Sequence, residues 1–164
     1  MFKQLVMPVV LVLVCLAATA WCVQAPPAPP KVRIGVYDSR AIAVAAIRSE
    51  ANARRLEALA AQKDKSVMKA LQLLNHLQGF STAPVDEYLD EHREALPKIA
   101  RDANVVAIVP KAHHSDPAAV ELVDVTDALV ELFKPTDKTR DGVRELRKHK
   151  AVDMLEILKN PEGF

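Results

Sequence analysis

The run His113-His114-Ser115-Asp116 holds the residue types that could bind a metal ion. Imidazole and carboxylate groups are zinc ligands, but a typical zinc site draws three or four ligands from at least two elements. Neighbouring histidine side chains usually diverge, and no His-Glu-x-x-His run or cysteine pair accompanies this one. A solvated loop explains the run better than a metal site, so we expect no metal and no cofactor.

Acid–base chemistry has one other candidate, an acidic stretch near the middle of the chain. Helical spacing places four of its carboxylates along one stripe, with Asp86 beside them: Glu87, Asp90, Glu91 and Glu94. Negative charge also suits the first turn of a helix. We therefore interpret the stretch as a solvated helix face. No nucleophile elbow and no glycine-rich phosphate loop is present, so the sequence predicts a protein that is not an enzyme.

Two basic clusters, Arg54-Arg55 and Lys63-Asp64-Lys65, are candidates for binding nucleic acid or lipid headgroups. Neither is interleaved with aromatic residues, and acids lie close to both. The whole chain has 22 basic and 21 acidic residues, a formal net charge of +1. Such a balance gives no long-range attraction to polyanions, and we expect no nucleic-acid partner.

A group of large apolar residues lies where two expected helices meet. It comprises Leu71, Leu73, Leu77, Phe80 and Tyr88, with Leu74 beside them. One helical seam cannot bury Leu71, Leu73 and Leu74 together, so part of this surface should stay exposed unless another subunit covers it. Core or oligomer contact and contact with a client or partner both remain open.

The elements that position these residues begin after an export signal at 1–25. Lys3 precedes an apolar run, and small residues allow cleavage after Ala20 or Ala25. The apolar stretch 5–23 also approaches the roughly 20 residues that span a bilayer, so an uncleaved membrane anchor is the alternative. Either outcome predicts a periplasmic or otherwise exported protein. Both cysteines lie in this segment, so no disulfide is expected in the exported part.

Beyond the proline-rich linker at 26–31, the sequence predicts an α+β fold. Strands are expected at 32–37, 105–109 and 120–123. A helix is expected at 40–78, a stretch without proline or glycine, with Gly79 as its C-cap. With a returning helix at 84–103 it would form a long helical hairpin, a coiled-coil arm at about 50–100. Pro97 should kink or split the returning helix. The main domain would cover 32–135, followed by a helical C-terminal extension at 136–164.

The order of these segments is distinctive. VRIGVYDS at 32–39 precedes the hairpin, and NVVAIV at 104–109 follows it. A loop with Ser115-Asp116-Pro117 then leads to VDVTDAL at 123–129. This arrangement resembles the Skp/OmpH family of periplasmic chaperones. The resemblance covers two pieces of the chain that together hold about 45 residues.

The resemblance implies a homotrimer in which each subunit gives strands to a small β-barrel and extends an arm around unfolded outer-membrane proteins. It also implies core or oligomer positions at Ile34, Val36, Val106, Ile108, Leu122 and Val125. The resulting hypothesis is an exported holdase for unfolded envelope proteins. The short returning helix and the C-terminal extension favour the alternative, a structural or adaptor protein of the cell envelope that oligomerises through the β core.

Overall fold

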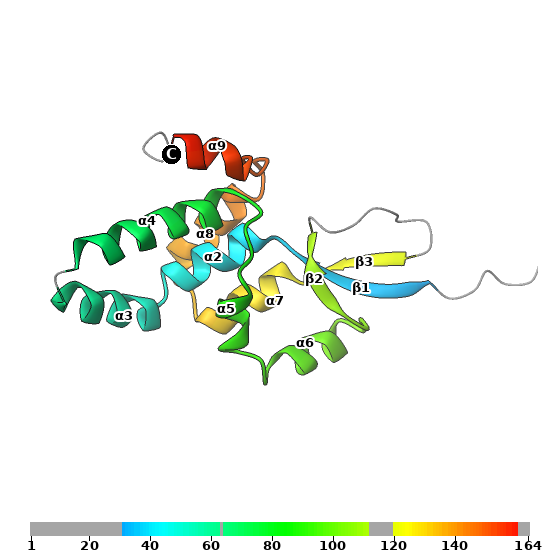
Figure 1. The fold of residues 1–164 in the computed structure, drawn as a ribbon. Coiled ribbons are helices and arrows are strands. Elements are labelled where there is room, and N and C mark those ends of the chain that lie inside the picture. Colours follow the sequence, from blue (N-terminus) through cyan, green and yellow to red (C-terminus); the bar gives the residue numbers. More distant parts are fainter. Residues whose placement is uncertain (1–30, 63, 112–119, 161–164) are drawn as a thin grey trace, which may run out of the picture. The chain divides into compact units, whose positions relative to one another are not determined.

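The computed structural model describes residues 31–62, 64–111 and 120–160. They belong to one compact unit, Lys31–Phe164, which is separate from Met1–Pro30. The fold is α+β and mostly helical, with one small sheet (Figure 1). The elements are β1 (Val32–Tyr37), α2 (Ser39–Ile47), α3 (Glu50–Ala61), α4 (Lys65–Phe80), α5 (Asp86–Asp90), α6 (Leu96–Asp102), β2 (Ile108–Pro110), β3 (Val120–Asp124), α7 (Thr126–Val130), the 3-10 helix η2 (Glu131–Phe133), α8 (Asp137–Leu146) and α9 (Met154–Lys159).

The three described strands form an open parallel sheet in the order β2-β1-β3. Val36 is paired with Val109 on one side and with Asp124 on the other. The β-barrel that the resemblance implied is not shown by the described strands. The helices α2 to α6 lie between β1 and β2 in the chain, as a crossover between parallel strands requires.

The register separates the two faces of the sheet, because successive side chains of a strand point to opposite sides. Arg33 and Glu121 share one face and form an ion pair of 3.2 Å between Nε and Oε1. Farther along that face, Tyr37, Val123 and Ile108 pack in or against the main hydrophobic core. The opposite face of β1 and β3 carries apolar side chains at Val32, Ile34, Val36, Val120 and Leu122.

Strand β2 begins later than the sequence predicts, at Ile108 rather than at residue 105. The preceding residues still reach β1, because Val106 N–H donates to Arg33 O and Gly35 N–H donates to Ala107 O. A Cβ on Gly35 would lie 3.2 Å from Ala107 O, closer than ordinary contact. The glycine therefore permits this close approach, which turns Val106 outward.

The single helix predicted at 40–78 is wrong: the chain forms α2, α3 and α4 instead. Ser49 caps α3 by accepting from Asn52 N–H, and it donates to Ala46 O at the end of α2. Asp64 caps α4 by accepting from Ser66 and Val67 N–H. These bonds satisfy backbone groups that a helix end leaves unpaired. The long coiled-coil arm is therefore not shown.

Helix α2 takes the centre of the unit instead. It is buried around most of its surface, and α4, α7 and α8 pack on it. Helix α4 runs back alongside α2 (Figure 1). Small side chains at Ala41, Ala43, Ala45 and Ala46 leave room for close neighbours, while Ile42 fills the interior. Most of the folding energy of this region therefore comes from packing around α2.

The returning helix is also shorter than predicted. It is split into α5 and α6, with turns at 91–95 between them, and Pro97 lies in the first turn of α6. The sequence places the break after Leu96, but the chain breaks earlier, at 91–95, and Leu96 and Pro97 both lie in the first turn of α6, where proline is tolerated. The predicted glycine cap is wrong, because α4 continues to Phe80 and Gly79 has no positive φ.

The C-terminal residues 136–160 pack on the same unit. Thr136 caps α8, as the sequence predicts, and Val143 of α8 is buried against the core around α2. Helix α9 packs on α4 through Ile157, which is fully buried. Val152 N–H also donates to Phe80 O at 2.9 Å. The residues predicted as an extension thus contribute to the core.

Burial predicts a stability loss at high pH. Burial, then the charge of Asp86, raises the pKa of Tyr37 to about 12, and burial also raises the pKa of Tyr88. An unfolded tyrosine ionises near pH 10 while the folded phenols stay neutral, so stability should fall as pH rises from about 10 to 12. Ultraviolet phenolate absorbance and urea unfolding will check this. Since these are the only two tyrosines, phenolate formation at pH 10 in folded protein would contradict it.

Candidate functional site

Polar side chains gather where β1 and β3 lead into their helices. The carboxylate of Asp38 accepts from Arg40 Nε and Nη2 at 3.1 and 2.7 Å, and from Arg40 N–H at the start of α2. Thr126 Oγ1, fully buried, accepts from Asp38 N–H at 3.0 Å. Asp124 accepts from Thr126 N–H and from Arg147 Nη2.

Ligands often bind at the carboxyl end of parallel strands, so this junction is a candidate binding site by its position. Burial raises the pKa of Asp124, but hydrogen bonds from Thr126 and the charge of Arg147 outweigh this and hold the pKa below its usual value. Each of these polar groups already has a partner within the chain. The junction therefore acts structurally, by fixing the two turns to each other.

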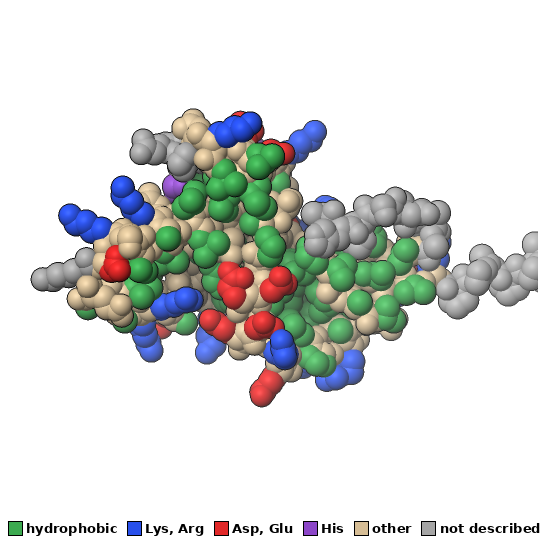
Figure 2. Space-filling view, viewed as in Figure 1, with side chains coloured by type: hydrophobic (Ala, Val, Ile, Leu, Met, Phe, Trp, Pro, Cys, Tyr) green, Lys and Arg blue, Asp and Glu red, His purple; other side chains and the backbone are tan. Residues whose placement is uncertain are grey.

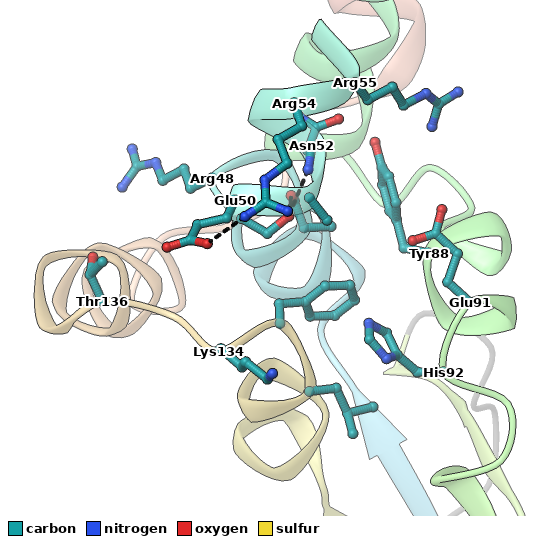
Figure 3. Close-up of a pocket in the computed structure, with 15 residues that line it drawn as sticks. Arg48, Glu50, Asn52, Arg54, Arg55, Tyr88, Glu91, His92, Lys134 and Thr136 are labelled. Atoms are coloured by element: carbon teal, nitrogen blue, oxygen red, sulfur yellow. Dashed lines mark hydrogen bonds and ion pairs between the residues drawn. The ribbon is translucent and has the colours of Figure 1, made fainter. Parts of the chain in front are cut away.

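A cleft of about 630 Å³ lies at the C-terminal end of α2, whereas the junction lies at its N-terminal end (Figure 3). Its walls come from the end of α2 and the start of α3, from α5 and the turn after it, and from η2 with the residues that follow. The lining residues are Ala46, Arg48, Ser49, Glu50, Ala51, Asn52, Arg54, Arg55, Tyr88, Glu91, His92, Leu132, Phe133, Lys134 and Thr136. Its volume falls in the range of ordinary ligand sites.

The cleft holds an excess of positive charge. Four cations line it, Arg48, Arg54, Arg55 and Lys134, against the carboxylates of Glu50 and Glu91. Arg54 and Glu50 form one ion pair of 3.5 Å, in which both side chains are largely exposed. Exposed pairs of this kind contribute about 0–1 kcal/mol, so Arg54 can exchange partners at little cost.

Aromatic side chains form the apolar wall of the cleft. The ring of His92 meets the ring of Phe133 edge-on, with centroids 4.8 Å apart. Tyr88 is buried, and its hydroxyl donates to Gln78 Oε1 at 2.9 Å. Figure 3 shows Arg54 and Arg55 of α3 on one side of the cleft and His92 and Lys134 on the other. The cleft thus presents cations beside an apolar wall.

Metal-binding side chains are not clustered in the described part of the chain. Among its residues, no group of three or more His, Cys, Asp or Glu is placed to hold a metal ion. The run at 113–116 lies outside the described residues. No described helix combines the length and apolarity needed to cross a membrane. The cleft is arranged for binding, and its cations and apolar wall could hold an anionic ligand.

The apolar group predicted as a client contact lies on and beside α4. Leu71, Leu73 and Leu77 are half-buried, and Phe80 is 38% exposed at the end of the helix. Tyr88 is 7% exposed and lines the cleft beside α5, apart from the exposed surface of α4. The group still lies where two helices meet, since α4 ends at Phe80 and α5 begins at Asp86.

The positions implied as core or oligomer contacts divide into three groups. Val36 and Val125 are buried, and Ile34 and Ile108 are half-buried. Val106 and Leu122 lie outside the core: Val106 is 75% exposed and Leu122 is 40% exposed. Val32, at the start of β1, is 51% exposed. Figure 2 shows apolar side chains gathered over the strands and again beside α9, with acidic residues over α5 between them.

Sequence reasoning found only part of the cleft. It singled out Arg54-Arg55 as a candidate for binding nucleic acid or lipid headgroups, Glu91 as part of a solvated helix face and Tyr88 as part of an apolar contact surface. It missed Arg48, Phe133 and Lys134, which reach the cleft from other elements. No spacing in the sequence connects these residues, since the fold alone brings η2 opposite α3.

Comparison with known proteins gives no relative: no protein family, curated protein or solved structure matches this chain.

Proposed function

We propose that this chain is an exported, non-enzymatic adaptor of the cell envelope that self-associates through its small sheet. Export rests on the sequence of residues 1–25. The observation that carries self-association is the exposed apolar surface of the sheet, at Val32 and Leu122 on the strands and at Val106 just before β2.

Two physical arguments support assembly at this surface. Parallel sheets occur almost only where both faces are covered, and here one face of β1 and β3 is lined by valine, isoleucine and leucine. In addition, β2 and β3 are the two edges of the described sheet. Unpaired edge strands are ready templates for pairing with another chain. A second subunit would cover the apolar face and extend the sheet.

Holdase activity is a second candidate. It is favoured by the apolar side chains that α4 and α9 leave exposed, among them Leu74, Phe80, Leu155 and Leu158. The arm on which this hypothesis first rested is not shown. Suppression of the aggregation of an unfolded outer-membrane protein at several-fold excess would favour the holdase over the adaptor.

Self-association predicts that residues 26–164 form a homo-oligomer that Leu122→Asp disrupts. A buried, unpaired carboxylate at an apolar interface is costly, so the variant should become monomeric while its thermal unfolding changes little. Light scattering gives the mass in solution. Leu155→Asp on α9, where the leucine is 63% exposed, is the matched control and should stay oligomeric. A monomeric parent protein would refute the proposal.

A further inference from the structure

Arg55 and Lys134 of the cleft, like Arg48, have no carboxylate within ion-pair distance among the described residues. The ion pairs found there do not include these residues, whereas nearby Arg54 is paired with Glu50. Surface cations commonly lack partners, so this alone carries little weight. It matters here because these three line a concave site with an apolar wall.

The backbone at Lys134 gives a second and independent observation. Lys134 ends η2 in the left-handed conformation, with φ 50° and ψ 54°. Glycine and asparagine adopt this conformation most readily, and in other residues it costs conformational energy. Strained positions of this kind gather at ligand sites. Figure 3 shows the Lys134 side chain directed into the cleft on the side of His92, where a glycine would supply no charge.

The shape and chemistry of the walls limit the ligand class. Arg54 and Arg55 lie on α3, and Lys134 lies across the cleft after η2. One ligand that meets both sides needs more than one negative charge. Phe133 and Leu132 between them need an apolar group. An extended peptide with carboxylates alternating with apolar side chains meets both needs.

Nucleic acid fits the cleft less well. The ring of Phe133 already meets His92 at an interplanar angle of 89°, which leaves no aligned pair of rings for bases to stack on. The net charge of +1 also gives no long-range attraction to a polyanion. A peptide with carboxylates and apolar side chains matches the cations of the cleft, and it needs neither stacking rings nor a long-range positive field.

We propose that the cleft between α3, α5 and η2 binds an acidic peptide segment in which carboxylates alternate with apolar side chains. Arg55 and Lys134 contact the carboxylates, and Arg54 joins them by exchanging Glu50 for the ligand. The apolar side chains pack against Phe133 and Leu132. This site is separate from the exposed sheet surface, so it holds whether or not the protein self-associates.

The test uses residues 26–164 and a fluorescein-labelled peptide in which three glutamates alternate with two leucines. Fluorescence polarisation should detect its binding, and the affinity should fall with added salt because the contacts are charged. The same peptide with glutamine for glutamate should lose at least about tenfold in affinity. A peptide with serine for leucine should also bind more weakly, since it lacks the apolar contact.

Arg55→Gln with Lys134→Gln should weaken binding about tenfold, as expected for loss of two partly exposed charge contacts. The matched control is Arg101→Gln with Lys159→Gln, which removes two exposed cations from α6 and α9 and should bind like the parent. Circular dichroism will verify that both variants are folded. The proposal is overturned if the parent binds no peptide or if the two double variants bind the peptide equally well. It is also overturned if single-stranded DNA competes as strongly as the unlabelled peptide.

Discussion

Replacing Asp38 with alanine should lower the free energy of unfolding by about 4 kcal/mol, the largest loss we expect from one substitution. The Asp38 side chain is 17% exposed, and that of its partner Arg40 is 7% exposed. Alanine leaves the Arg40 guanidinium buried without a counter-charge, which costs about 3–5 kcal/mol in comparable pairs. It also removes the N-cap of α2, worth about 1 kcal/mol.

Two further variants separate these contributions. Asp38→Asn keeps a capping oxygen and loses the charge, so it should be less harmful than alanine. Combining Asp38→Asn with Arg40→Met removes both charges and should recover part of the loss, because no uncompensated charge remains. Urea unfolding measures each value, and the double-mutant cycle gives the coupling between the two residues.

Asp90→Ala is the matched control for Asp38→Ala. Asp90 accepts from Arg93 Nη2 at 2.7 Å, the same length as the buried contact, but both side chains are well exposed. Its loss should change the free energy of unfolding by about 0.5 kcal/mol or less. If Asp38→Ala cost no more than Asp90→Ala, the buried position of the Asp38–Arg40 pair would be contradicted.

Local signals in the sequence are strong enough to predict some elements. The β-rich run at Val32–Tyr37 is a strand, a helix starts after Thr136, and the returning helix is interrupted close to Pro97, although before Leu96 rather than after it. Each of these depends on the residue type and its nearest neighbours. Proline fixes φ, and a threonine hydroxyl can accept from an N–H three residues ahead wherever the rest of the chain lies.

The breaks at Ser49 and Asp64 could not be predicted in this way. Serine and aspartate inside a helix cost about 0.7 kcal/mol or less relative to alanine, so neither forbids a continuous helix. Continuing the helix would have carried α4 away from α2. Folding back instead lets α4 pack on α2, as the structure shows. The choice depends on buried area between segments that are distant in sequence.

The cleft also depends on contacts between segments that are distant in sequence. Arg54-Arg55 is visible in the sequence as a charged pair, but its value as a site depends on Phe133 and Lys134 lying opposite. That placement depends on the packing of α7 and α8 on α2. A sequence pattern can therefore nominate one wall of such a site, and the tertiary fold must supply the other.

Gln78→Leu should lower the free energy of unfolding by about 3 kcal/mol, because it leaves buried polar groups without partners. Gln78 is 1% exposed near the end of α4. Its Nε2 donates to Pro84 O at 3.0 Å and to the carboxylate of Glu87, and its Oε1 accepts from the Tyr88 hydroxyl. Leucine matches its volume approximately but can make none of these bonds. Urea unfolding measures the loss.

Gln72→Leu, at an exposed position of the same helix, is the matched control and should change the free energy of unfolding by about 0.5 kcal/mol or less. Adding Tyr88→Phe to Gln78→Leu should cost less than the sum of the two single changes, because both partners of one hydrogen bond are then removed. Strict additivity would contradict the bond. Tyr88 also lines the cleft, so Gln78→Leu should weaken hydrogen-exchange protection in α5. Unchanged protection there would mean that Gln78 does not hold this wall of the cleft in place.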